Sequence, residues 1–157
     1  MSRIALIAGI SAFIVAIAAF VVVTDAPAYM GSDPNTCNNC HVMDAAYENW
    51  YHAGHRAGEV VCVDCHLPHD NVIAYYLEKG RSGMHDVYVF STGQAPVMIR
   101  ASEHTKEIIQ SNCIRCHQGR VQNMLAGQPA FERYCWDCHR AVAHGERGIS
   151  IAPRQDP

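Results

Sequence analysis

The chain has 157 residues, with 15 acidic and 12 basic side chains and a formal net charge of −3. Its hydrophobic content of 49% and lack of a basic surplus argue against a disordered acidic tail and against a nucleic-acid-binding protein. Eight cysteines and ten histidines stand out, and the even number of cysteines fits disulfides, zinc or haem.

Residues 4–23 form an apolar stretch without a charge. As an α-helix this stretch would be about 30 Å long, which matches the hydrocarbon core of a bilayer. Arg3 precedes it and Asp25 follows it, so the positive-inside rule predicts that residues 1–3 are cytoplasmic and that the rest crosses the membrane. A cleaved signal peptide is the alternative. Because the stretch is longer than a typical signal core, we favour a retained transmembrane helix.

All eight cysteines belong to four copies of one pattern, Cys-x-x-Cys-His. The four pairs are Cys37 and Cys40, Cys62 and Cys65, Cys113 and Cys116, and Cys135 and Cys138. This pattern is the attachment signature of c-type haem, in which two thiols bind the porphyrin edge and the next residue places an imidazole under the iron. The sequence therefore predicts four covalently attached haem c groups.

Structural zinc and disulfides are the alternative uses of paired cysteines. A zinc ribbon also contains two Cys-x-x-Cys pairs, and disulfides are common in exported domains. Neither alternative explains a histidine directly after every pair, so we adopt the haem interpretation.

Four haems on about 120 exported residues leave roughly 30 residues for each, too few for a separate apolar core. The haems must therefore form much of the core and lie close together, which makes electron transfer the default function. We expect a mainly α fold with irregular loops, that is, a multihaem cytochrome c domain on a single N-terminal transmembrane helix. The expected divisions are a cytoplasmic end (1–3), the transmembrane helix (4–23), a linker (24–36), the tetrahaem domain (37–144) and a C-terminal tail (145–157).

The long segment between the second and third motifs contains two predicted helices. The first covers residues 71–79 and is expected to end at the glycines of 80–83. A turn is expected at 93–96. The second helix covers 102–110, with Ser102 as its N-cap, and leads into the third motif.

Four haems offer eight axial positions, and the motif histidines can fill four of them. Six other histidines remain: His52, His55, His69, His85, His104 and His144. His144 is only five residues after His139, so it cannot cover the opposite face of the same haem and would bind another one. His55 is similarly free to bind a neighbouring haem. For most of the six, the alternative is a solvated or hydrogen-bonded side chain.

Met43 is a candidate ligand of the first haem. It follows His41 by two residues, and its thioether is long and flexible enough to replace the imidazole. The alternative is a core methionine that packs on the porphyrin. Methionine ligation would raise the potential of this haem relative to bis-histidine neighbours.

In combination, the motifs resemble the NapC/NirT family of membrane-anchored tetrahaem quinol dehydrogenases. The motifs that carry the resemblance are the N-terminal helix, the Cys-x-x-Cys-His-x-Met opening, CVDCHLPH at 62–69, HDVY at 85–88, TKE at 105–107, and YCWDCHR at 134–140 followed by His144. The resemblance covers nearly the whole chain. Within the family, the chain is most similar to members that serve a cytochrome c nitrite reductase.

The resemblance implies a ligand for each iron. Haem 1, nearest the membrane, is attached through Cys37 and Cys40, and its iron is bound by Met43 rather than His41. The other matching ligands are His66, His117 and His139 after the motifs, with His55 and His144 as the two distal histidines. Two distal histidines for three haems leave one position, which a lysine of the catalytic partner fills in the family.

The resemblance also implies a quinol site beside haem 1, formed by Asp86 and Lys79. Quinol oxidation releases protons as well as electrons, so Asp86 would accept a proton and Lys79 would hold the quinone oxygen. Without the resemblance, the two residues would be a surface acid and a lysine whose stem covers apolar surface. His85 and His104 depart from the family pattern, and His85 could perturb Asp86 or compete for iron.

The predicted protein is a membrane-anchored tetrahaem cytochrome c that oxidises menaquinol. Its haem domain is expected on the periplasmic side of the inner membrane, in complex with a pentahaem nitrite reductase catalytic subunit that converts nitrite to ammonia. One alternative is a general quinol dehydrogenase for other periplasmic reductases. Another is a soluble electron-shuttle cytochrome released by signal cleavage.

Overall fold

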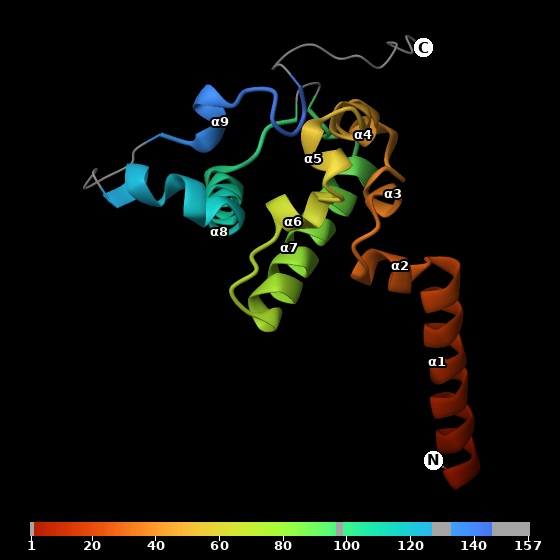
Figure 1. The fold of residues 1–157 in the computed structure, drawn as a ribbon. Coiled ribbons are helices and arrows are strands. Elements are labelled where there is room, and N and C mark those ends of the chain that lie inside the picture. Colours follow the sequence, from red (N-terminus) through yellow and green to blue (C-terminus); the bar gives the residue numbers. More distant parts are fainter. Residues whose placement is uncertain (1, 97–98, 127–132, 146–157) are drawn as a thin grey trace, which may run out of the picture.

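The structure, a computed structural model, describes residues 2–96, 99–126 and 133–145 (Figure 1). The elements in these ranges are α1 (Arg3–Val23), α2 (Ala26–Met30), α3 (Pro34–Cys37), the 3-10 helix η1 (His41–Met43), α4 (Asp44–Tyr51), α5 (Gly54–Ala57), α6 (Cys62–His66), α7 (Val72–Ser91), α8 (Glu103–Ala126) and α9 (Cys135–Cys138). No strand occurs in the described ranges, which confirms the mainly α prediction. Apart from residue 145, the expected C-terminal tail lies outside the described residues.

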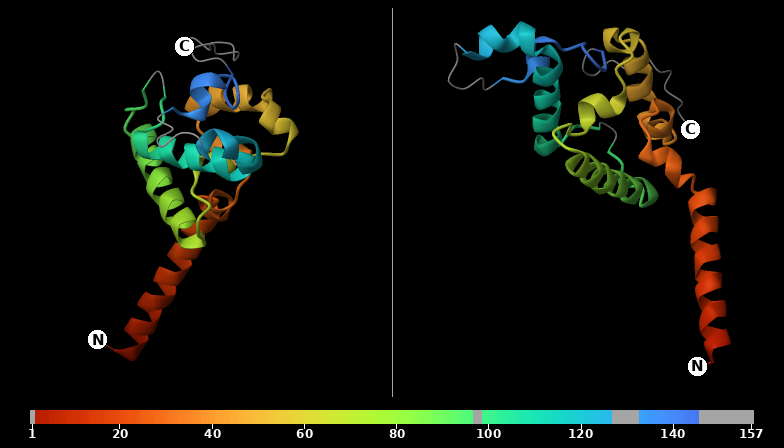
Figure 2. Two further views of the ribbon diagram at one scale, coloured as in Figure 1. Left: turned by 60° about the vertical axis from the view of Figure 1, so that its left-hand side comes forward. Right: turned by 60° about the horizontal axis from the view of Figure 1, so that its bottom comes forward.

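Helix α1 projects away from the other helices (Figures 1 and 2). It has a mean hydropathy of 2.9, and none of its side chains is buried. Both ends are capped: the Ser2 hydroxyl accepts from the Ala5 amide at 3.2 Å, and the Thr24 hydroxyl donates to the Phe20 carbonyl at 2.7 Å. A helix of this length and hydropathy, with its apolar side chains exposed, is suited to crossing a bilayer.

The expected linker contains two short helices rather than irregular chain. Helices α2 and α3 each have a proline in the first turn, where the missing amide hydrogen has no partner to lose. At α3, the Asp33 carboxylate also accepts from the Asn35 amide at 2.9 Å. As a result, Cys37 lies at the end of α3, only a short distance along the chain from the membrane helix.

Helix α7 continues well beyond the predicted segment 71–79, and the prediction that glycines 80–83 end it is wrong. A glycine in a helix costs about 1 kcal/mol relative to alanine, which propagation of a capped helix can offset. The cap is present, because the Asn71 side chain accepts from the Ala74 amide at 2.8 Å. The helix ends instead just before Gly93, whose φ of +68° starts the turn expected at 93–96.

Helix α8 begins as predicted, with the Ser102 hydroxyl accepting from the Thr105 amide at 3.2 Å. It is longer than expected and runs through the third Cys-x-x-Cys-His motif. At His117 the backbone leaves helical values, with φ −105° and ψ 15°. The helix therefore kinks at the motif histidine.

The protein core of the described residues is small. Their buried side chains are Trp50, Val63, Leu67 and Asn112. The chain exposes 12210 Å², whereas a compact monomer of 17.3 kDa would expose about 7800 Å². Part of the excess comes from α1. A small apolar core is also expected for a domain in which large bound groups complete it.

Candidate haem-binding and quinol site

The second and fourth motifs each form one turn of helix, α6 and α9. In both, an aspartate before the second cysteine caps the turn. Asp64 accepts from the Val61 amide at 2.9 Å, and Asp137 accepts from the Tyr134 amide at 3.0 Å. A helical turn places positions i, i+3 and i+4 on one face. The two thiols and the histidine of each motif therefore lie on the same side of the backbone.

The first motif has a different backbone. Helix α3 ends at Cys37, and a separate 3-10 turn starts after Cys40, so no single helical turn contains both cysteines. The His41 ring packs edge-on against Phe90 of α7, with the ring centroids 5.6 Å apart. Met43 is half-buried at the end of the same turn. This departure occurs at the motif for which methionine ligation is predicted.

Two pairs of histidines face each other across the haem domain. The ring centroids of His55 and His117 are 6.2 Å apart, and those of His66 and His144 are 6.1 Å apart. Each pair joins a motif histidine to one of the two predicted distal histidines. Imidazole nitrogen binds a transition metal at about 2 Å, so two rings on opposite sides of one ion have centroids about 6 Å apart. The spacing fits one iron in each pair.

Backbone carbonyls orient the two distal histidines. Nδ1 of His55 lies 2.8 Å from the Val142 carbonyl oxygen, and Nδ1 of His144 lies 2.9 Å from that of Ala46. Because a carbonyl oxygen can only accept a hydrogen bond, Nδ1 must carry the hydrogen, which leaves Nε2 with a free lone pair. This is the arrangement that holds metal-ligating histidines in place. The donor set therefore fits haem iron.

The environment of His66 favours its neutral form. Desolvation by the surrounding chain, together with the nearby charge of His144, lowers the pKa of the His66 imidazole, although the residue stays accessible to solvent. The neutral imidazole is the form that binds a metal.

The other four of the six additional histidines have different partners. His52 lies 3.7 Å from Glu48, His69 3.2 Å from the Val63 carbonyl, His85 3.4 Å from Asp86, and His104 3.2 Å from Glu78. The structure thus separates His55 and His144 from the rest. In the part of the chain that the structure describes, no imidazole ring faces His139.

Successive motifs approach one another at their cysteines. A hydrogen bond from the Cys62 thiol lowers the pKa of Cys37 to about 7, and the same bond raises the pKa of Cys62. Burial, with Cys135 and Cys65 nearby, raises the pKa of Cys113 to about 12. None of the eight cysteines forms a disulfide in the structure. The four motifs therefore follow one another in space in their chain order.

Lys79 and Asp86 lie on one face of α7, seven residues or about two helical turns apart. Both act on the first motif, because the Lys79 charge lowers the pKa of the Cys37 thiol and the Asp86 charge raises it. The structure thus brings the two predicted quinol-site residues near Cys37 of the first motif.

The two residues differ in their surroundings. The Lys79 ammonium donates to the Gly31 carbonyl and lies 5.6 Å from the centre of the Tyr75 ring. Partial burial lowers the pKa of Lys79. Asp86 keeps 78% of its side chain exposed and has His85 as its neighbour at 3.4 Å. Lys79 is therefore held in place, whereas the Asp86 carboxylate is open to an incoming hydroxyl group.

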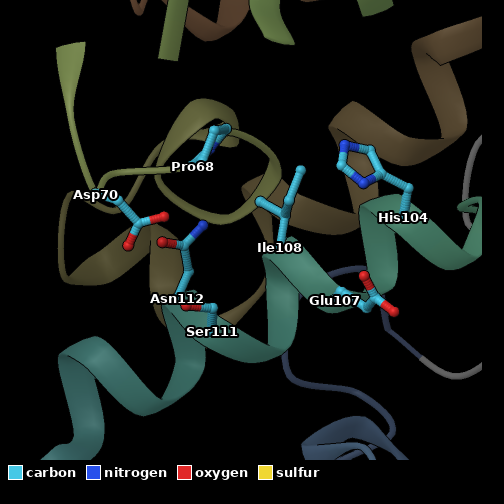
Figure 3. A pocket seen from close by; sticks show the side chains of 7 residues that line it. All are labelled: Pro68, Asp70, His104, Glu107, Ile108, Ser111 and Asn112. Atoms are coloured by element: carbon cyan, nitrogen blue, oxygen red, sulfur yellow. The ribbon is translucent and has the colours of Figure 1, made fainter. Parts of the chain in front are cut away.

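A pocket of about 210 Å³ lies between the loop after α6 and helix α8 (Figure 3). Its lining residues are Pro68, Asp70, His104, Glu107, Ile108, Ser111 and Asn112. None of them is a predicted haem ligand or quinol-site residue. The pocket is therefore distinct from the site described above.

Sequence reasoning missed Asn112. Its side chain is buried, and Nδ2 donates to the Cys65 and Leu67 carbonyls at 3.0 and 2.8 Å. These bonds tie the second motif to α8 immediately before Cys113. A polar residue one position before a motif was the only local signal, and it does not reveal the contact.

Replacing Asn112 with alanine is expected to lower the free energy of unfolding by about 1–3 kcal/mol, because two carbonyls lose their buried donor. Denaturant unfolding of the haem-loaded protein measures the change. The matched control is Asn123→Ala, an exposed position on the same helix, for which we expect less than about 0.5 kcal/mol. Equal losses in the two variants would contradict the structural role of Asn112.

A projecting apolar helix and four Cys-x-x-Cys-His motifs, two of whose histidines face a second histidine, define a helical c-type cytochrome with a membrane anchor. Residues 1–108 match the N-terminal region of the NapC/NirT cytochrome c family. The chain belongs to this family, whose membership implies covalently bound haem.

Three comparisons describe the likeness further. The chain is 35% identical over 155 residues to the cytochrome c-type protein NrfH of Wolinella succinogenes, covering 90% of this chain and 87% of that protein. It is 35% identical over 108 residues to the cytochrome c nitrite reductase subunit NrfH of Nitratidesulfovibrio vulgaris, which covers 69% of this chain and 65% of that protein. A chain in the crystal structure of the cytochrome c nitrite reductase NrfHA complex bound to the HQNO inhibitor is 30% identical, with a TM-score of 0.67 and 97% coverage of both chains.

Proposed function

We propose that this protein is a membrane-anchored tetrahaem cytochrome c that oxidises menaquinol and passes the electrons to the catalytic subunit of a periplasmic nitrite reductase. The observation that carries the proposal is that two pairs of histidines face each other, His55 with His117 and His66 with His144. They lie among four Cys-x-x-Cys-His motifs that follow one another in space. The likeness to NrfH proteins and to the NrfHA complex supports the terminal reaction.

The eight motif cysteines would attach four haems, each of which takes up and passes on one electron at a time when bound. Met43 would bind the first iron. His66 with His144, and His117 with His55, would hold the second and third. His139 would bind the fourth, and its distal position would be filled by a lysine of the catalytic partner, as the family resemblance implies.

The arrangement of the sites supports a path away from the membrane. The first motif begins at the end of α3, close in the chain to α1, whereas α9 with the fourth motif lies far from α1 (Figure 1). Because successive motifs adjoin, electrons that enter beside Lys79 and Asp86 would leave near His139. The position without its own distal histidine is thus the one that would meet the partner.

Asp86 and Lys79 would have different roles at the bound quinol. The exposed Asp86 carboxylate would accept a proton from a quinol hydroxyl, and His85 is within reach of the same carboxylate. The Lys79 ammonium would hold the quinone oxygen. Since the Gly31 carbonyl and the Tyr75 ring already restrict Lys79, little ordering is needed on binding.

In vesicles that contain menaquinol and a nitrite reductase catalytic subunit, this chain is expected to be required for ammonia formation. The measurement is ammonia produced from nitrite with and without the chain, after its intact mass has confirmed four haems and residues 1–26. Haem reduction without ammonia would favour the general quinol dehydrogenase. A mature chain lacking those residues would favour the soluble shuttle.

A further inference from the structure

Between Val72 and Tyr88, helix α7 carries a long apolar face that no described element covers. Its members, all exposed, are Val72, Ile73, Tyr76, Leu77, Gly80, Gly83, Met84, Val87 and Tyr88. At 100° per residue they occupy an arc of about 160°, which includes no charged residue. An exposed apolar surface of this length on an otherwise charged helix indicates an interaction site.

The position of α7 relative to α1 identifies what covers this face. Figures 1 and 2 show α7 at the end of the haem domain from which α1 emerges. The Lys79 ammonium ties α7 to the Gly31 carbonyl, eight residues after the last residue of α1. Since α1 has the length of the hydrocarbon core, a helix held beside its exit lies at the depth of the bilayer surface.

The charges at the edges of the apolar face also suit a lipid surface. Lys79 and Arg81 lie about 20° beyond its two edges. Arg81, which pairs with Glu78 at 2.6 Å, keeps 60% of its side chain exposed, and a basic side chain at this edge can reach phosphate headgroups. Of the acidic residues of the helix, Glu78 lies on the opposite side, and Asp86 lies about 40° beyond the edge nearest Lys79, where the quinol site is proposed. Two tyrosines within the face, Tyr76 and Tyr88, are the amphipathic aromatic type that is enriched at membrane interfaces.

We propose that α7 is an interfacial membrane helix whose apolar face is embedded at the boundary between lipid headgroups and acyl chains. It forms a second attachment that fixes the haem domain against the bilayer, whereas α1 alone would leave the domain free to tilt. A face turned towards the membrane that α1 spans is not available to a periplasmic protein partner. The inference is independent of the quinol reaction, because lipid contact is measurable whether or not quinol is oxidised.

Photo-crosslinking of the haem-loaded chain in vesicles tests the inference. The photoreactive residue p-benzoylphenylalanine replaces Leu77 in one variant and Met84 in a second, and an unchanged haem spectrum shows that each variant is folded. The vesicles contain phosphatidylethanolamine and phosphatidylglycerol. The control variant carries the same residue at Tyr51, an exposed side chain on α4 that is not part of the apolar face of α7.

Mass spectrometry after irradiation is expected to find at least about tenfold more phospholipid adduct at positions 77 and 84 than at position 51. Equal adduct at all three positions would overturn the proposal. Adducts to a second copy of the chain or to a reductase subunit, in place of lipid, would also overturn it and would identify the face as a protein interface.

Discussion

Replacing Asp86 with asparagine is expected to slow menaquinol oxidation by about 10²–10⁴-fold, the usual contribution of a general base. The amide keeps the size of the side chain but cannot accept the quinol proton at neutral pH. Stopped-flow absorbance of the haems, with a menaquinol analogue as reductant in vesicles, measures the rate. Lys79→Ala is expected to slow the same reaction, because the quinone oxygen loses its ammonium partner.

Two controls separate loss of the base from loss of structure. Glu103→Gln neutralises another exposed carboxylate, at the start of α8, and should leave the rate unchanged. Direct chemical reduction of all haems should be unaffected in Asp86→Asn and Lys79→Ala. If both variants oxidise menaquinol at the original rate, the proposed quinol site is wrong.

Replacing His144 with alanine is expected to change one haem from the low-spin to the high-spin state. In the structure, His144 faces His66 at 6.1 Å and is fixed by the Ala46 carbonyl, so no other imidazole is placed to take over its position. Removal of a strong axial ligand weakens the ligand field and raises the potential of that haem. Electron paramagnetic resonance of the oxidised protein counts the low-spin haems before and after the change.

His104 supplies the matched control for this experiment. It is the same residue type, but it pairs with Glu78 rather than with a motif histidine. His104→Ala should therefore leave the number of low-spin haems unchanged, whereas His55→Ala should remove one, as His144→Ala does. A low-spin signal that persists in His144→Ala, or that disappears in His104→Ala, contradicts the ligand pairs. If the chain purified alone has only bis-histidine or His/Met irons, the partner-lysine proposal is wrong.

Much of the fold followed from local patterns. The uncharged stretch predicted α1 almost to the residue, and Ser102 predicted the start of α8 through its side-chain cap. Gly80 and Gly83 do not end α7, because the side-chain cap at Asn71 and the helix-forming residues around the glycines support one continuous helix. Asn112 could not be predicted, since its two acceptors are carbonyls in a segment more than 40 residues away in the chain.

By itself, the sequence determined the attachment chemistry and the anchor, because a Cys-x-x-Cys-His motif and an apolar stretch are complete within a few residues. The resemblance added the roles of Met43, Lys79 and Asp86 as predictions. Only the tertiary structure decided which distal histidine faces which motif, since the partners are far apart in the chain and meet when the segment after α9 packs on α4 and α5. It also decided that α7 presents one uncovered apolar face beside the anchor. That depends on how a single uninterrupted helix is oriented, which local spacing does not specify.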